Sequence, residues 1–423
     1  MTQHDFIQTL SHGKNCIWLF NIHAERIWHP QSFLLENDQF DLTKGMESVC
    51  MFLTKTTDYL ITTGFPDELF EQFERYGFEI PNLLTVEYKV GAVTVSECVL
   101  KDKKLLETLE QLKDTAILVP FAVTDVEEEI SRITGIKLVG ASAEIARTVN
   151  DKMFSRQIAD KLSFPVCEGG AFDTVKDAYS YYLSCVCKSK SEKMILKSPY
   201  SASGKGMYII ENEKQFKRIV KRADKLGLNR CCILEKWQEA KNDLNYQILI
   251  DDKGKINMFS LKQQLMSNVK YVGSVFRIQS NDWQNDFFEY GQAVGSVLYQ
   301  LGYRGVANID AIKTATVIIP ILEINGRFSL STYTSFCFER LNCDMIITKY
   351  YDVYTSAPDK LKQKLIEFTF ENEHRCILYS FSYMIMSKEV FICRTFVLFF
   401  GSTNEQLEKN IENLENILKT LVI

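Results

Sequence analysis

Short apolar runs alternate with amphipathic stretches along the first third of the chain. Runs that predict β-strands occur at 15–21, 58–64, 82–88, 115–121 and 136–140. Between them, residues 66–77 and 96–113 place apolar side chains at helical spacing and predict helices. Alternating strands and helices indicate a mostly parallel sheet, so this part is expected to form a Rossmann-like α/β domain. No G-x-G-x-x-G follows these strands, which argues against a dinucleotide site.

The pattern changes near Gly140. Residues 142–162 predict one helix, with Ser142 as its N-cap. Further strands are expected at 194–197, 207–210, 232–236 and 245–251, with helices at 213–226, 341–354 and 403–421. The apolar tract 377–400 predicts two strands joined at 387–389 rather than a membrane span, because its charged residues would be costly in a bilayer. The expected domains are 1–140, 141–345 with a lid subdomain at about 190–233, and a small α+β C-terminal extension at 346–423.

Composition places the chain among ordinary globular proteins and narrows its partners. It has 423 residues, 46% of them hydrophobic and 24% charged, and a net charge of −5. That charge argues against a nucleic-acid partner, and no segment predicts a membrane partner. The 12 cysteines are scattered without paired zinc spacing, so reduced, buried thiols are expected. The polar N-terminus has no signal-like apolar core, which favours a cytoplasmic location.

A predicted hairpin within residues 305–327 carries the most informative polar pattern. Successive strand residues point to opposite faces, so Glu323, Asn325 and Arg327 would share one face. With a turn at 314–317, Asp310 would lie opposite Glu323. Two carboxylates and an amide oxygen suit Mg²⁺, and thereby a nucleotide. The alternative at this point is an edge hairpin with solvated acids.

A small-residue loop at 200–206 lies between two predicted strands and has a composition that lets backbone N–H groups approach phosphates. It lacks the P-loop pattern, so an ordinary hairpin loop is an equal alternative. Lys197, at the end of the strand that enters the loop, and Lys152, on the preceding helix, could direct positive charge at phosphates, although solvated lysines are commoner. The strand at 232–236 leads into Trp237, where backbone groups could contact an adenine edge.

Taken in order, four sequence segments resemble the ATP-grasp superfamily. They are NDK at 150–152, LKSPYSASGKG at 196–206, LEKW at 234–237, and GVANID followed by EINGR within 305–327. The resemblance covers about 190 residues, and its specificity lies in the order and spacing of these segments. It implies a nucleotide held between two α+β lobes under a mobile lid. The expected fold is therefore a Rossmann-like domain, a two-lobed ATP-grasp domain and the C-terminal extension.

The resemblance also implies roles for individual residues. Two cofactors are implied, ATP and Mg²⁺, the latter as two ions held by Asp310, Glu323 and Asn325. Arg327 would stabilise charge on the acyl phosphate or the tetrahedral species, and with Lys197 is a catalytic candidate. The nucleotide-binding candidates are Lys152, Lys197, Ser201, Ser203, Gly204, Lys205, Gly206, Glu235, Lys236 and Trp237. Lys262, Lys270 and Arg277 lie where family members often present cations to the carboxylate, and Asn245 stands where the carboxylase branch commonly has Glu.

These roles predict an ATP-dependent ligase that activates a carboxylate as an acyl phosphate and joins it to an amine or thiol, releasing ADP and phosphate. The expected partners are a small-molecule carboxylate and an amine or thiol acceptor. A homodimer is a further expectation, since family members often pair subunits. The alternatives are a biotin-carboxylase-like enzyme and a non-catalytic ATP-binding regulatory protein. The sequence does not distinguish the acid or the acceptor, because pocket walls come from variable loops.

Overall fold

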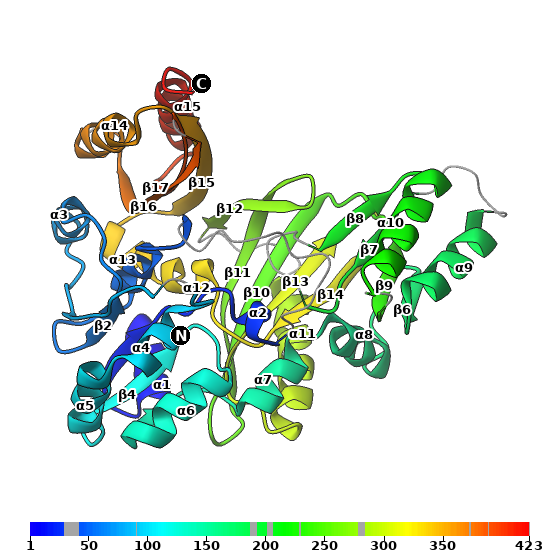
Figure 1. The fold of residues 1–423 in the computed structure, drawn as a ribbon, viewed down its shortest axis with the longest axis horizontal. Coiled ribbons are helices and arrows are strands. Elements are labelled where there is room, and N and C mark those ends of the chain that lie inside the picture. Colours follow the sequence, from blue (N-terminus) through cyan, green and yellow to red (C-terminus); the bar gives the residue numbers. More distant parts are fainter. Residues whose placement is uncertain are drawn as a thin grey trace.

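Three β-sheets organise the chain (Figure 1). The structure, a computed structural model, describes residues 1–28, 42–89, 91–186, 193–200, 206–227, 230–277, 284–371, 374–387 and 389–422. Within them the sheets have five, eight and four strands. Figure 1 shows the eight-stranded sheet in the middle, with the five-stranded sheet on one side of it and the four-stranded sheet on the other.

The N-terminal sheet is parallel throughout, with strand order β3-β2-β1-β4-β5. Its strands are β1 (Asn15–Leu19), β2 (Tyr59–Thr62), β3 (Asn82–Thr85), β4 (Ala116–Pro120) and β5 (Lys137–Leu138). Its helices are α1 (Gln3–Ser11), α2 (Ala24–Trp28), the 3₁₀ helix η2 (Met46–Phe52), α3 (Glu68–Arg75), α4 (Val95–Lys101), α5 (Lys103–Leu112) and α6 (Asp125–Thr134). All five predicted strands are present. Their nearly continuous apolar runs fit a parallel sheet covered on both faces.

Two stretches predicted as single helices are each split in two. Residues 96–113 form α4 and α5, which meet at Asp102, and residues 142–162 form α7 (Ala143–Val149) and α8 (Lys152–Lys161). The cause is the same in both, because a carboxylate accepts a backbone N–H and starts a new helix. The Asp102 side chain accepts from the N–H of Leu105, and that of Asp151 from the N–H of Met153. The second break makes Lys152 the first residue of α8.

The four-stranded sheet is antiparallel, with order β6-β9-β7-β8. Its strands are β6 (Gly169–Phe172), β7 (Met194–Lys197), β8 (Met207–Ile210) and β9 (Cys232–Lys236), and its helices are α9 (Val175–Val186) and α10 (Glu213–Lys225). Phe216 of α10 is fully buried among residues of α9 and of β7, β8 and β9. β7, β8, β9 and α10 lie where the sequence predicts them.

The eight-stranded sheet is antiparallel, with order β14-β13-β10-β11-β12-β15-β17-β16. Its strands are β10 (Asn242–Ile250), β11 (Ile256–Ser267), β12 (Lys270–Arg277), β13 (Gly305–Lys313), β14 (Ile318–Asn325), β15 (Met345–Thr355), β16 (Cys376–Ser387) and β17 (Val390–Gly401). The associated helices are α11 (Gln284–Gln300), α12 (Leu330–Thr334), α13 (Cys337–Leu341), α14 (Pro358–Phe370) and α15 (Asn404–Lys419). The strands of the predicted C-terminal extension thus continue the sheet that carries the hairpin. The boundaries between domains stay predictions.

The predicted helix at 341–354 is wrong, because most of it belongs to β15. The segment Met345–Thr355 is rich in Ile, Tyr, Thr and Val, which favour a pleated and partly buried surface. It pairs with β12 on one side and β17 on the other. Pairing on both edges satisfies the backbone of the segment better than an isolated helix would. The predicted strand pair within 377–400 and the predicted C-terminal helix are present as β16, β17 and α15.

Two predictions from composition can be compared with the described residues. Among these residues, the cysteines form no disulfide, and all but Cys185 and Cys231 are buried. No helix in the described parts of the chain has the length and apolar character needed to cross a membrane.

Candidate functional site

The β13–β14 hairpin has the register that the sequence predicts. Its turn closes where Thr314 donates its backbone N–H to the carbonyl oxygen of Val317 at 2.9 Å. Asp310 consequently pairs with Glu323, and Asn308 with Asn325. Because side chains alternate along each strand, Asp310, Glu323 and Asn325 face the same cavity. The two carboxylates and the amide oxygen are therefore neighbours on one face.

Asp310 is surrounded by amide groups that fix its carboxylate. Asn245 Nδ2 and Gln264 Nε2 both donate to Asp310 Oδ1, at 2.7 and 2.8 Å. Within the described parts of the chain, the other oxygen, Oδ2, has only a longer contact of 3.4 Å with Asn325 Nδ2. Burial, and secondly the negative charge of Glu323, raise the pKa of Asp310 to about 6. A cation placed between the two carboxylates would remove that repulsion.

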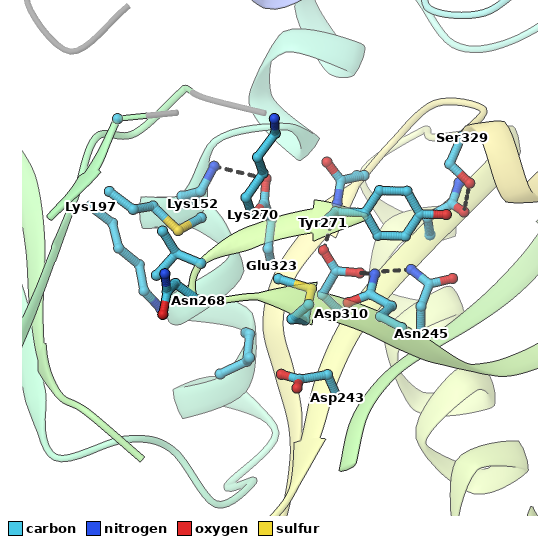
Figure 2. A pocket seen from close by; sticks show the side chains of 18 of the residues that line it. Lys152, Lys197, Asp243, Asn245, Asn268, Lys270, Tyr271, Asp310, Glu323 and Ser329 are labelled. Atoms are coloured by element: carbon cyan, nitrogen blue, oxygen red, sulfur yellow. Dashed lines mark hydrogen bonds and ion pairs between the residues drawn. The ribbon is translucent and has the colours of Figure 1, made fainter. Parts of the chain in front are cut away.

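Lys152 and Glu323 form an ion pair beside Asp310. Lys152 Nζ donates to Glu323 Oε1 at 2.8 Å, and the lysine is only 1% exposed (Figure 2). The lysine reaches Glu323 because α8 begins at residue 152 and packs against β14. This contact uses one oxygen of Glu323, and no hydrogen bond of its Oε2 is found among the described residues. The predicted phosphate lysine is thus adjacent to the predicted metal carboxylates.

Glu235 connects a second buried lysine to an arginine. Its Oε2 accepts from Lys197 Nζ at 2.6 Å, and its Oε1 accepts from Arg156 Nη1 at 3.1 Å. Burial by itself would lower the pKa of Lys197, but the attraction of Glu235 outweighs it and raises the pKa. Lys197 therefore carries its charge at neutral pH. Glu235, predicted to contact adenine, has its carboxylate engaged in positioning Lys197.

The segment predicted to meet adenine follows β9. The backbone N–H of Lys236 donates to the carbonyl oxygen of Glu168 at 2.7 Å, and that of Trp237 to the carbonyl oxygen of Lys193 at 2.9 Å. Both donors are thus used within the protein, so contacts from these two residues to adenine would have to come from their carbonyl oxygens or side chains. Lys236 also pairs through its side chain with Glu168. Both residues line the cavity.

Arg327 lies just beyond β14 and is held by its neighbours. Its Nη2 donates to Asn325 Oδ1 at 2.8 Å and its Nη1 to the carbonyl oxygen of Phe328 at 3.2 Å. The guanidinium also lies 5.4 Å from the ring centroid of Phe121 on the N-terminal domain. These contacts aim the cation at the edge of the cavity next to the carboxylates.

One cavity of about 1000 Å³ collects the predicted site residues that the structure describes. Its lining includes Lys152, Lys197, Gly206, Glu235, Lys236, Trp237, Asp310, Glu323, Asn325 and Arg327. Ser201, Ser203, Gly204 and Lys205 lie outside the described residues. Of the further cations suggested by the resemblance, Lys270 lines the cavity, Lys262 is buried beneath it and Arg277 is exposed. The placement is as expected, and the individual roles stay predictions.

Several residues at the cavity have no role in the sequence-based prediction. Asn245 and Gln264, which hold Asp310, are on β10 and β11, and their relation to the hairpin depends on strand order. Arg156 follows Lys152 by four positions on α8, so i,i+4 spacing was an available signal. Asp243 lines the cavity and makes no hydrogen bond or ion pair among the described residues, and burial raises its pKa (Figure 2).

A divalent cation fits the hairpin on chemical grounds. Oxygen ligands are what Mg²⁺ takes. Asp310 Oδ2, the second oxygen of Glu323 and the Asn325 amide oxygen, which also accepts from Arg327, would supply them. Among the described residues no group of three or more His, Cys, Asp and Glu side chains could hold a metal ion. The site therefore offers a partial set of ligands, as expected for Mg²⁺ that takes its other ligands from water and phosphates.

Comparison with known proteins gives one family match and a relative that covers most of the chain. Residues 151–336 match the model of the carbamoyl-phosphate synthase L chain, ATP binding domain. The [Butirosin acyl-carrier protein]--L-glutamate ligase of Niallia circulans is 24% identical over 333 residues, which are 76% of this chain and 74% of that protein. The family match begins one residue before Lys152 and ends beyond Arg327, so it covers the whole candidate site.

Solved structures share the fold over nearly the whole chain. The ADP complex of an N5-carboxyaminoimidazole ribonucleotide synthetase has a TM-score of 0.57 at 12% identity, covering 96% of this chain and 98% of that one. The biotin carboxylase domain of the Hydrogenobacter thermophilus 2-oxoglutarate carboxylase, with MgADP and bicarbonate, has a TM-score of 0.56 at 12% identity, covering 95% and 89%. These likenesses confirm the predicted fold class.

Proposed function

Because the chain belongs to the ATP-grasp superfamily, we propose that it is an ATP-dependent ligase that activates a carboxylate as an acyl phosphate and joins it to an amine or thiol. The prediction of family membership is confirmed, and with it an ATP-binding ligase of the carboxylate–amine class. The acyl phosphate, the magnesium ions and the roles of single residues are the parts that we propose. The observation that carries them is the convergence of Asp310, Glu323 and Asn325 with Lys152 and Lys197 on one cavity.

In the proposed reaction, a carboxylate oxygen attacks the γ-phosphorus of ATP and the bond to the β-phosphate oxygen breaks, leaving ADP and an acyl phosphate. Lys152 and Lys197 would hold the phosphates in line and offset the charge that gathers on the transferred group. Asp310, Glu323 and Asn325 would hold Mg²⁺, which supplies further positive charge to the phosphates when bound. Both lysines are already fixed by carboxylates, so little reorganisation is needed.

In the second step, the amine nitrogen attacks the acyl carbon, inorganic phosphate leaves with the bonding electron pair, and the nitrogen loses a proton. Arg327 would stabilise the negative charge on the acyl oxygen through its guanidinium group. Its bond to Asn325 would hold it next to the carboxylates. No side chain becomes covalently attached in this scheme.

The first acid to test is L-glutamate, because the relative that matches 76% of this chain is named as a ligase of L-glutamate. ADP release would be followed with MgATP, a panel of mono- and dicarboxylates that includes L-glutamate, and hydroxylamine as the amine. Hydroxylamine traps an acyl phosphate as a hydroxamate, so we expect acid-dependent ADP release with an equal amount of hydroxamate.

Two controls separate this proposal from the alternatives. The first control adds bicarbonate and free biotin in place of the acid panel. If these alone stimulated ADP release, a biotin-carboxylase-like enzyme would be favoured. A thermal shift with MgATP but no turnover with any acid would favour a regulatory ATP-binding protein, since a ligand that binds only the native state stabilises it. Either result would reject the proposed ligase.

Asp243 is proposed to accept hydrogen bonds from the nucleotide, because it is a half-buried carboxylate in the cavity without a partner among the described residues. We expect Asp243→Asn to raise the KM for ATP roughly 10-fold with little change in kcat, as for the loss of a charged hydrogen bond. The control is Asp252→Asn, an exposed carboxylate beyond the other end of β10. Steady-state kinetics with varied ATP measures both, and an unchanged KM in Asp243→Asn would exclude the contact.

A further inference from the structure

Three charged residues on the neighbouring strands β12, β15 and β17 form a second polar cluster in the cavity. Arg394 and Asp352 lie directly opposite each other on β17 and β15. Arg394 Nε and Nη2 donate to the two oxygens of Asp352 at 2.7 and 3.0 Å, and Lys270 Nζ of β12 donates to Oδ2 at 3.0 Å. The ring of Tyr350 lies 5.2 Å from Lys270 Nζ and 5.6 Å from the Arg394 guanidinium carbon.

This cluster keeps one unit of positive charge. Two cations share one carboxylate, and burial, which alone would raise the pKa of Asp352, is outweighed by its bonds to Arg394 and Lys270, which lower it. Asp352 is therefore ionised at neutral pH, and its bidentate contact fixes the plane of the guanidinium. Arg394 Nη1 makes no hydrogen bond among the described residues. A fixed, partly buried guanidinium with a spare donor is a recognition site for a carboxylate.

The cluster belongs to the same cavity as the phosphate site but not to the same set of contacts. Lys270, Asp352 and Arg394 line it together with Asp310 and Glu323, and Figure 2 shows Lys270 beside the cavity that Lys152 and Glu323 enter. In strand order, β12 and β15 are separated from β13 by β10 and β11. A cavity of about 1000 Å³ is at the upper end for single-ligand pockets, so a second molecule fits beside a nucleotide.

We propose that Arg394, oriented by Asp352 and assisted by Lys270, binds a second carboxylate of the acid substrate, one that is not activated. The substrate class is then a short dicarboxylic acid, including acidic amino acids. This inference rests on the proposed ligase function and deepens it. The C-terminal strands β15 and β17 would thereby supply substrate selection, whereas the hairpin and the two phosphate lysines supply the chemistry.

The test uses dicarboxylates and the monoamides that lack one charge. Each pair keeps one carboxylate for activation: L-glutamate with L-isoglutamine, L-aspartate with L-isoasparagine, and glutarate with glutaramate. With MgATP and hydroxylamine, we expect the wild-type protein to prefer the dicarboxylate of at least one pair in kcat/KM by roughly 10- to 100-fold, as for a charge-assisted hydrogen bond. In Arg394→Gln that ratio should fall toward one, mainly through the KM of the dicarboxylate.

Lys270→Gln serves as a second variant that is safer for folding, because Lys270 is half-exposed at the start of β12. It should reduce the preference in part. The matched control is Lys349→Gln. Lys349 lies on β15, as Asp352 does, and forms an ion pair with Glu415, but it does not line the cavity. Its preference should equal that of the wild type, and melting temperatures confirm that each variant is folded.

The outcomes distinguish this inference from the proposed function. Equal kcat/KM values for the two members of every pair would overturn the dicarboxylate inference and leave the ligase standing. An equal loss for both members of a pair in Arg394→Gln would also overturn it. No ADP release with any acid would reject both. A selective loss for the dicarboxylate supports the assignment.

Discussion

Asp310→Asn is expected to lower ADP release roughly 10³-fold, since it removes a charged oxygen ligand from the site where positive charge is needed. The same change is expected to stabilise the metal-free protein at neutral pH. Asp310 is partly buried next to Glu323, and its pKa is raised to about 6, so its ionised form is unfavourable in the fold. Asn retains an oxygen that can accept from Asn245 and Gln264.

The pH dependence follows from the direction of that shift. An acid whose pKa is higher in the folded state than in the unfolded state binds more protons when folded, so folding stability falls as pH rises between the two values. For Asp310 the window runs from the ordinary pKa of 3.8 to about 6. Metal-free Asp310→Asn should therefore match the wild type near pH 4. Above pH 6 it should exceed the wild type by about 3 kcal/mol, the equivalent of two pKa units.

Chemical unfolding at several pH values in a chelator, followed by the same series with Mg²⁺, measures both effects. Added Mg²⁺ and nucleotide should stabilise the wild type and have little effect on Asp310→Asn. Glu323→Gln provides the contrast, because it leaves Lys152 buried without its carboxylate and should lose about 3–5 kcal/mol of stability as well as activity. Equal stability of Asp310→Asn and the wild type at pH 8 would contradict the unfavourable burial of the ionised Asp310 next to Glu323.

The hairpin could be predicted from the sequence because its strand register depends only on the position of the turn and the spacing of nearby residues. A turn at Thr314 to Val317 and a side-chain period of two residues are sufficient to place Asp310 opposite Glu323. The parallel N-terminal sheet was also predictable, since its strands are short apolar runs between amphipathic helices. Both features follow from spacing along a single stretch of chain.

The remaining features depend on neighbours that are distant in sequence. Met345–Thr355 is a strand because β12 and β17 flank it, and no property of the segment identifies those partners. Likewise, Glu235 holds Lys197 and Arg156 only because β9 lies next to β7 and faces α8. The cytoplasmic location and the pairing of subunits stay predictions from the sequence.

The two phosphate lysines differ in whether their carboxylate partner also binds a second cation. Their substitutions should therefore lower the free energy of unfolding by different amounts. Lys197→Gln removes one of two cations bound to Glu235, and Arg156 remains to neutralise the carboxylate. Among the described residues, Lys152 is the cation that forms an ion pair with Glu323, and Lys152→Gln removes it. A buried charge that loses its sole partner is far more destabilising than one that keeps a second partner.

We therefore expect Lys197→Gln to lower kcat/KM for ATP roughly 10²- to 10³-fold with a small change in unfolding free energy. Lys152→Gln should lose a similar amount of activity and also about 3 kcal/mol of stability. Lys217→Gln is the matched control, because its side chain pairs with Glu213 at the surface of α10 and does not line the cavity.

Steady-state kinetics and urea unfolding of the three variants under one set of conditions make the comparison. Normal turnover in Lys197→Gln would contradict the assignment of that lysine to the phosphates. A large stability loss in Lys197→Gln would instead indicate that Arg156 by itself is not sufficient to neutralise Glu235. Arg156→Gln should then be equally destabilising. If the two pairs behave as their geometry indicates, the charge of Lys197 is retained in the fold for binding and catalysis rather than for stability.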